Sequence, residues 1–427
     1  MQNRVQKKKK ISLTTMIFIA LLAGALTGVI INYLIPSNYV VDDIIVQGVF
    51  YIVGQGFIRL MRMLVVPLVF CSIVCGSMAV GDTKKLGSVG VKTLIFYLCT
   101  TALAITIALT IANIFNPGKG LDMSQIQVTS TVSETTQSMG MTETLLDIIP
   151  VNIFNSLSEG NMLQIIVFAL ILGVILANMG DRVDIVKNFF GQFNDIMMEM
   201  TMAVMKLAPI GVFCLIAKTF AEIGFEVFIP LLKYMFCVLL ALAVQCFVVY
   251  LGLLKIFSGL NPFIFIKNFF PVMAFAFSTS TSNATIPMNI DTLAEKMGVS
   301  KKISSFTIPL GATINMDGTS IMQGVAVVFT AQAFGIPLDM MDYLTVIGTA
   351  TLASIGTAGV PSVGLITLTM VFNSVGLPIE GIALIMGIDR ILDMTRTAVN
   401  ITGDAVCTTI VASWNKAVDR DVYYNRK

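Results

Sequence analysis

The residues best suited to chemistry lie in one apolar stretch near the C-terminus. It contains Asp389, Asp393, Arg396, Asn400 and Asp404. At about 100° per residue in an α-helix, these side chains fall within roughly 80° of one another and form a stripe about 22 Å long. Because an ionised group within hydrocarbon costs at least about 2.5–3.5 kcal/mol, we expect this stripe to face protein rather than lipid.

The charges of this stripe suit a ligand that carries both signs of charge. Asp393 can accept an ammonium group, and the planar guanidinium of Arg396 can donate two hydrogen bonds to a carboxylate. The pair therefore favours an amino dicarboxylate over a plain C4-dicarboxylate. Three acids with Arg390 and Arg396 leave net negative charge, so we expect the stripe to stay unbalanced until a substrate and cations bind. A self-neutralising ladder, with Asp393 paired to Arg396 one turn on, is the alternative, and Arg390 is placed to pair with Asp389 or to extend toward the membrane surface.

A second candidate site lies at residues 315–319, where the sequence Asn-Met-Asp-Gly-Thr interrupts an apolar run. Unwinding of the helix at this point would expose backbone carbonyl groups. Carbonyl, amide and carboxylate oxygens are the ligands that a hard cation such as sodium prefers. Asp317 and Asp404 are therefore candidate charged ligands of a coupling ion. A structural kink would explain Gly318 but not the acid beside it.

Two further polar segments interrupt apolar stretches in corresponding positions. The segment 278–287 precedes the Asn-Met-Asp-Gly-Thr motif by about 30 residues, and the segment 354–364 precedes the charged stripe by a similar distance. Paired interrupted segments indicate the inverted repeats of secondary transporters, in which broken helices meet at the binding site. Two unrelated kinked helices are the alternative.

The overall composition places the chain in a membrane and excludes several other functions. Hydrophobic residues make up 56% of the 427 residues and charged residues only 12%. The net charge of +2, without a basic face, excludes nucleic acid as a partner. The chain has no histidine, so it contains neither a Ser-His-Asp triad nor a histidine proton relay, and no phosphate-binding GxxxxGK[ST] loop is present. The seven cysteines lie in apolar runs, where cysteine behaves as a small hydrophobic residue.

The elements that must position these sites are membrane helices, and the predicted fold class is an all-α multi-pass membrane protein. Six stretches long enough to cross about 30 Å of hydrocarbon are followed by four interrupted ones. If the first and third interrupted stretches are re-entrant helical hairpins, the chain has eight transmembrane helices. Basic residues near both ends then predict cytoplasmic termini, although the lysines at 7–10 would also suit anionic lipid. The polar segment 116–147 would lie outside the cell, and we expect it to be mobile. The stretches are 12–35, 49–80, 88–115, 148–179, 195–221 and 229–256, then 262–292, 300–331, 340–374 and 378–414.

Together these motifs resemble those of the dicarboxylate/amino acid:cation symporter family, which includes archaeal sodium-aspartate transporters and eukaryotic excitatory amino acid transporters. The resemblance covers nearly the whole chain and is strongest from Phe277 to Val411. It implies a homotrimer with an elevator-type mechanism, in which a fixed scaffold holds a moving transport domain. Residues 1–87 and 116–225 would form the scaffold with the outer loop, and residues 88–115 and 226–427 would form the transport domain.

The resemblance also implies site residues, by motif match. Substrate contacts would come from Ser282, Thr319, Val360, Gly364, Asp393, Arg396, Thr397 and Asn400. Three sodium sites would comprise Gly311, Asn315, Asn400 and Asp404; then Thr313, Ser354, Ile355 and Thr357; and finally Tyr97, Thr100, Thr101, Asn315 and Asp317.

From these observations we expect a sodium-coupled symporter of L-aspartate or L-glutamate in the cell membrane, with no enzymatic activity. The substrate, sodium ions and membrane lipid are the expected partners. A proton-coupled carrier and a C4-dicarboxylate carrier are the alternatives within transporters. A channel, with the Asp and Ser/Thr breaks as its selectivity filter, is the alternative outside them.

Overall fold

The computed structural model describes residues 13–36, 38–81, 88–121, 149–224, 228–355 and 363–425. Within these ranges the regular elements are helices, and the one β-bridge pairs Val299 with Val418. The helices are α1 (Leu13–Leu34), η1 (Val40–Phe50), α2 (Tyr51–Gly81), α3 (Ser88–Phe115), α5 (Ile153–Glu159), α6 (Met162–Met179), η3 (Gly180–Val183), α7 (Asp184–Met205), α8 (Ala208–Ile223), α9 (Phe228–Ala243), η5 (Val244–Tyr250), α10 (Leu251–Ser258), α11 (Pro262–Thr279), α12 (Ser282–Met297), α13 (Lys301–Ile314), α14 (Asp317–Ala333), α15 (Met340–Ser354), α16 (Val363–Ser374), α17 (Gly381–Trp414) and α18 (Arg420–Tyr423).

The first six predicted stretches are helical, but two of them are divided. The stretch predicted at 148–179 forms α5 and α6, since Gly160 caps α5 in the left-handed conformation with φ 72°. The stretch predicted at 195–221 forms α7 and α8, because Pro209 lies in the first turn of α8 and has no N–H to continue the preceding helix. The second stretch begins earlier than predicted, since η1 runs directly into α2.

Within the described residues, six helical segments are long and apolar enough to cross a membrane. The segment Pro262–Thr279 is among them, although the sequence predicted it as one arm of a re-entrant hairpin. The predicted crossings at 300–331 and 378–414 are not among them, because the first is broken at Asn315 and the second carries charged side chains. The described residues therefore establish an all-helical membrane protein, while the eight crossings and two re-entrant hairpins stay predictions.

The predicted interruptions occur where the polar sequences lie. The chain reverses between α11 and α12, which contact each other, and Ser280 at the junction is left-handed with φ 53°. The helix also breaks between α13 and α14, where Asn315 and Met316 leave the helical conformation. Residues 356–362, between α15 and α16, lie outside the described residues.

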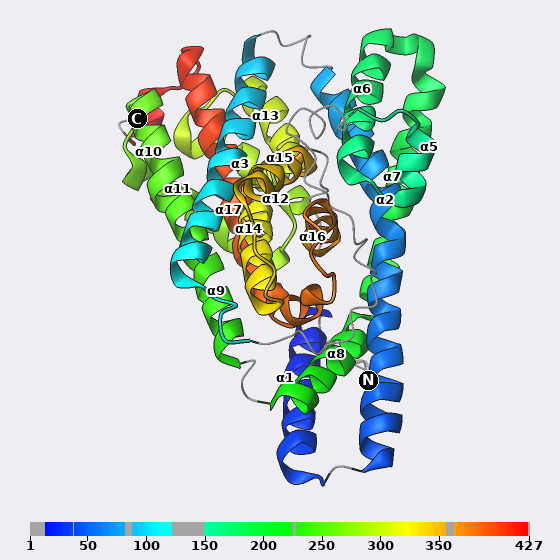
Figure 1. Cartoon of the computed structure of the whole chain (residues 1–427). Coiled ribbons are helices and arrows are strands. Elements are labelled where there is room, and N and C mark those ends of the chain that lie inside the picture. The colour runs from blue at the N-terminus through cyan, green and yellow to red at the C-terminus, as the bar shows by residue number, and fades with distance from the viewer. Residues whose placement is uncertain are drawn as a thin grey trace, which may run out of the picture.

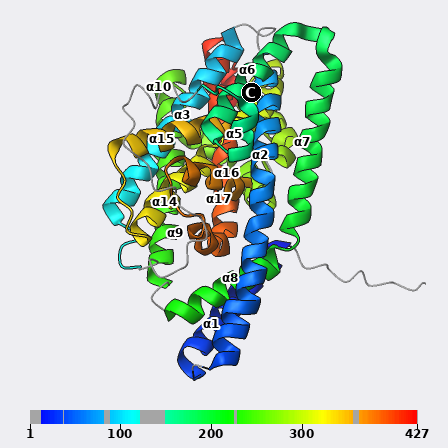
Figure 2. The same cartoon turned by 45° about the vertical axis from the view of Figure 1, so that its right-hand side comes forward.

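The helices pack as two sets (Figures 1 and 2). In one set α1 packs on α8, and α2 packs on α6, α7 and α8. Gly24 and Gly28 allow the close approach of α1 to α8, because a Cβ at Gly24 would lie 2.7 Å from the carbonyl oxygen of Phe213. Small residues four apart are a common means of close helix packing in membranes.

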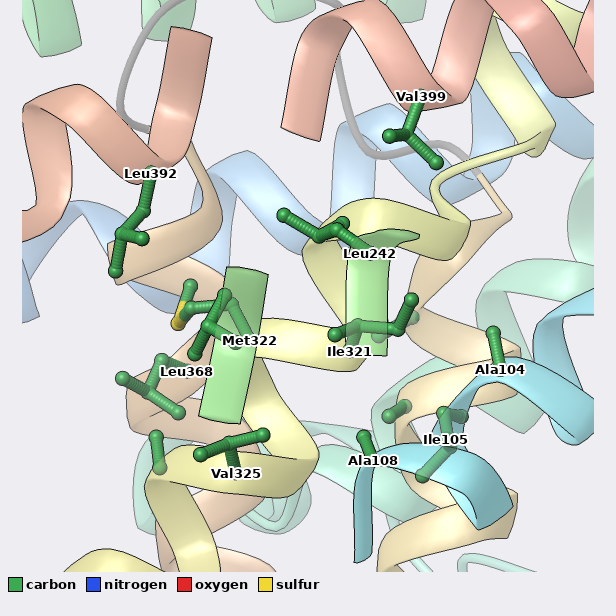
Figure 3. Packing of buried hydrophobic residues seen from close by; sticks show 14 of the residues in the cluster. Ala104, Ile105, Ala108, Leu242, Ile321, Met322, Val325, Leu368, Leu392 and Val399 are labelled. Atoms are coloured by element: carbon green, nitrogen blue, oxygen red, sulfur yellow. The ribbon is translucent and has the colours of Figure 1, made fainter. Parts of the chain in front are cut away.

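The second set surrounds α14, which packs on α3, α9, α15, α16 and α17. Figure 3 shows Met322 and Val325 of α14 near Leu368 of α16, and Ile105 and Ala108 of α3 in the same core. Gly324 of α14 allows close contact with α3, because a Cβ there would lie 3.1 Å from the Cβ of Ala108. This packing fixes α14 and α17, which carry the candidate site residues.

Candidate functional site

The charged stripe of α17 faces protein, as the helical periodicity predicts. Asp389, Asp393, Arg396, Asn400 and Asp404 are all buried, with 6% or less of each residue exposed. One uninterrupted helix carries them, so their order along its axis follows their order in the sequence. The stripe thus divides into a part around Arg396 and a part around Asp404.

Arg396 is already paired with acids of its own helix. Its Nη1 lies 2.8 Å from Oδ1 of Asp389, and its Nη2 lies 2.7 Å from Oδ1 of Asp393. Arg390 pairs with the other oxygen of Asp393 at 3.2 Å. The expectation that the guanidinium stays unbalanced without substrate is therefore wrong. Two arginines and two aspartates form a neutral cluster, which contains the Asp393–Arg396 pair of the alternative interpretation.

Elements from outside α17 bring two predicted substrate residues, Gly364 and Thr319, to this cluster. A Cβ at Gly364, in the first turn of α16, would lie 3.0 Å from Cγ2 of Thr319 and 3.4 Å from Nη2 of Arg396. A side chain at this position would therefore force its neighbours to shift by a few tenths of an ångström, and glycine allows the close approach of α16 to Arg396. Asn400 accepts a hydrogen bond of 2.7 Å from the backbone N–H of Gly318, which fixes the start of α14 against α17.

The first predicted ion set is also assembled. Asn315 donates to Oδ1 of Asp404 at 2.9 Å and to the carbonyl oxygen of Asn400 at 3.3 Å. Gly311 approaches the carboxylate of Asp404 so closely that a Cβ there would collide with it. The Oδ1 atom of Asn315 is buried and has no hydrogen-bond partner in the described structure. A buried acceptor without a donor, beside a carboxylate, suits a cation.

The third predicted ion set converges on Asp317, which is fully buried. Thr101 donates to its Oδ1 at 2.5 Å, and Tyr250 and Gln245 donate to its Oδ2 at 2.6 and 3.0 Å. Gln245 and Tyr250 are absent from the set implied by the sequence. Both belong to η5, in a stretch that the sequence indicated only as an ordinary spanning helix. These partners are all donors, which fits an ionised carboxylate that only accepts.

The remaining members of the predicted ion sets form local hydrogen bonds. The hydroxyl group of Thr100 donates to the carbonyl oxygen of Tyr97, and the Tyr97 hydroxyl donates to that of Thr307. In the second set, Thr313 donates to the carbonyl oxygen of Pro309.

Other predicted residues are described only in part. The Ser354 hydroxyl donates to the carbonyl oxygen of Thr351. Thr357 lies outside the described residues. The second ion set, which also includes Thr313 and Ile355, therefore stays a prediction. Val360 also lies outside the described residues. Ser282 is buried at the start of α12, and Thr397 donates within α17 to the carbonyl oxygen of Asp393. Among the described residues, no cluster of three or more acidic or cysteine side chains forms a transition-metal site.

Comparison with known proteins identifies the family of this chain. The sequence model of the Sodium:dicarboxylate symporter family matches residues 13–414. This chain belongs to that family. It is therefore a membrane transporter and not an enzyme, and the channel interpretation is set aside.

Relatives within the sodium:dicarboxylate symporter family align over nearly their whole length. The chain is 39% identical to the proton/sodium-glutamate symport protein of Bacillus caldotenax over 411 residues, 95% of each protein. It is 36% identical to the proton/glutamate-aspartate symporter of Escherichia coli (strain K12) over 422 residues, 97% of this chain and 95% of the relative. It is 32% identical to C4-dicarboxylate transport protein 1 of Ralstonia nicotianae over 409 residues, 95% of this chain and 93% of the relative.

Proposed function

We propose that this symporter carries an acidic amino acid, L-aspartate or L-glutamate, together with sodium ions across the cell membrane. The observation that carries the proposal is the Asp393–Arg396 ion pair, buried against Gly364 and Thr319. Such a pair offers one anionic and one cationic partner at a single point. In a substrate that has both an ammonium group and a side-chain carboxylate, the carboxylate can replace Asp393 as the partner of Arg396, and the ammonium can replace Arg396 as the partner of Asp393.

Substrate binding is then an exchange of ion pairs. The side-chain carboxylate of the substrate takes the Nη2 donor of Arg396 from Asp393, and the substrate ammonium takes the freed oxygen of Asp393. Asp389 keeps its bond to Nη1 and holds the guanidinium in place. A succinate molecule would displace Asp393 without offering it a cation, and a buried unpaired carboxylate is costly.

Sodium is the proposed coupling ion, with Asp404 and Asp317 as its charged ligands. Support comes from the buried Oδ1 of Asn315 beside Asp404 and from the three neutral donors around Asp317, which leave both acids without a cation. Oxygen ligands of this kind suit a hard monovalent cation. Protons are the second candidate, since the names of close relatives include proton symport.

The proposal also covers the oligomeric assembly of the protein and the movement of its transport domain. The helices α1, α2 and α5–α8 would form the scaffold of a homotrimer, and α3 with α9–α17 would form the moving domain, with both termini in the cytoplasm. The packing of α1 on α8 and of α2 on α6, α7 and α8 supports this division.

Uptake into proteoliposomes tests the proposal. Aspartate and glutamate uptake should follow an imposed inward sodium gradient at equal pH on both sides, and a proton gradient without sodium should not replace it. Succinate should compete poorly with aspartate. Uptake driven by protons alone would assign coupling to protons, and equal competition by succinate would overturn the role given to Asp393.

A further inference from the structure

A cavity of about 460 Å³ lies between α3, α10 and the C-terminal end of α17, and of its lining residues only Thr100 belongs to the substrate and ion sets named above. We name it the α3–α10 groove. Ile95 and Leu103 of α3, Phe257 of α10 and Trp414 of α17 line it, and each of these side chains is 40–56% exposed. Helix α17 contacts both α3 and α10, near the C-terminus in Figure 1. The volume falls within the range of about 300–1,000 Å³ typical of ligand pockets.

The groove has a polar end and an apolar length. Lys92, near the start of α3, is its only charged lining residue, and Trp414 lies at the last turn of α17 with its ring 5.7 Å from that of Phe257. From Lys92 to Leu103 the helix rises roughly 16 Å, which is about half of a 30 Å hydrocarbon core. Tryptophan and lysine are typical of the membrane–water interface. The groove therefore has the length and polarity of one lipid leaflet.

The charge of the groove favours an anionic lipid. Lys92 forms no ion pair with any residue that the structure describes, and no acidic side chain lines the groove. A zwitterionic headgroup carries its own cation and gains less from a single lysine than a net negative one does.

We propose that the α3–α10 groove is a binding site for an anionic phospholipid, with the headgroup at Lys92 and an acyl chain that runs along Ile95 and Thr100 toward Leu103. The aromatic rings of Phe257 and Trp414 flank the chain on the opposite side. The proposal does not depend on which substrate or coupling ion the protein uses, and its test involves neither, so it stands or falls separately from the proposed function.

The protein contains a single tryptophan, Trp414, and this residue reports directly on the groove. The full-length protein is reconstituted in phosphatidylcholine bilayers that contain a fixed fraction of phosphatidylglycerol, with bromine on the acyl chains of one lipid at a time. Bromine quenches tryptophan fluorescence on contact. Brominated phosphatidylglycerol should quench Trp414 with a relative binding constant on the order of five-fold above that of brominated phosphatidylcholine, the factor that corresponds to about 1 kcal/mol per lysine.

Two variants separate the headgroup contact from the chain contact. Lys92→Gln should remove the preference for phosphatidylglycerol while both brominated lipids still quench. Lys206→Gln, between α7 and α8, is the matched control and should keep the preference. Cys99→Phe places a large side chain in the groove and should reduce quenching by both lipids. Unchanged gel-filtration elution shows that each variant is folded.

Three results would overturn the proposal. They are equal quenching by the two lipids in the unmodified protein, a preference that persists in Lys92→Gln, and quenching that Cys99→Phe leaves unchanged. Native mass spectrometry supplies a second measurement, since Lys92→Gln should retain fewer phosphatidylglycerol molecules than Lys206→Gln.

Discussion

Replacement of Arg396 by glutamine separates the structural role of the guanidinium from its role toward substrate. The change removes the hydrogen bonds of 2.8 and 3.4 Å to the two oxygens of Asp389. Asp393 still keeps Arg390 at 3.2 Å. The cost of the substitution therefore falls mainly on Asp389.

The size of the expected loss of stability follows from the burial of the ion pair. The side chains of Arg396 and Asp389 are 1% and 2% exposed, so water cannot replace the lost partner. Removal of one member of a buried ion pair costs about 3–5 kcal/mol, and we expect Arg396→Gln to lower the free energy of unfolding by that amount. The double variant Arg396→Gln/Asp389→Asn leaves two uncharged amides in place of the buried ion pair. It should recover most of the stability, yet bind no acidic amino acid.

Thermal unfolding of the purified protein measures both effects, first without ligand and then with sodium and aspartate. Arg396→Gln should show a lower midpoint and no shift with aspartate, and the double variant should show a restored midpoint and still no shift. As a control, Lys301→Gln breaks an exposed ion pair with Asp291 and should cost no more than about 1 kcal/mol. An aspartate shift in either Arg396 variant, or a double variant no more stable than the single one, would refute the argument.

Three further substitutions test the neighbouring contacts. Asp404→Asn should weaken the sodium dependence of uptake, since a charged ligand is lost, and an unaltered sodium response would remove this residue from the ion site. Tyr250→Phe removes a 2.6 Å hydrogen bond to Asp317 and should cost about 1.5–3 kcal/mol, measured by thermal unfolding, with a changed sodium dependence. Gly364→Ala places a Cβ 3.0 Å from a side chain of α14 and should weaken aspartate binding measured by titration. Gly348→Ala, where a Cβ meets nothing within 4 Å, is its control and should bind aspartate normally.

The inward-facing stripe of α17 was predictable because helical periodicity alone decides which residues share a face. The ion pairs that form within the stripe could not be predicted in the same way. Arg396 and Asp389 are seven residues apart, so the sequence places them on one face, but two turns separate their Cα atoms by roughly 10 Å. Whether the long arginine side chain crosses that distance depends on side-chain conformation and on the lack of water, which the sequence does not specify.

The contribution of η5 to the ion site was missed for a geometric reason. Gln245 and Tyr250 are five residues apart, and in an α-helix they would point about 140° away from each other. The π-helical turns of η5 bond residue i to i+5, which brings residues at this spacing toward a common face and directs both side chains to Asp317. Polar residues within an otherwise apolar stretch were the available signal. The break between α7 and α8, by contrast, could have been predicted from Pro209.

The distribution of buried charge explains why substrate and cations should move together. Asp389 and Asp393 are balanced by Arg390 and Arg396, so the substrate end of α17 is neutral before binding. An acidic amino acid brings two carboxylates and one ammonium, and it therefore adds one negative charge to a buried region. The nearby acids of the proposed ion sites, Asp317 and Asp404, have neutral hydrogen-bond donors and add further negative charge in their ionised form. Because uncompensated buried charge is costly, cations at those acids lower the cost of binding the anionic substrate, and the substrate in turn favours their binding.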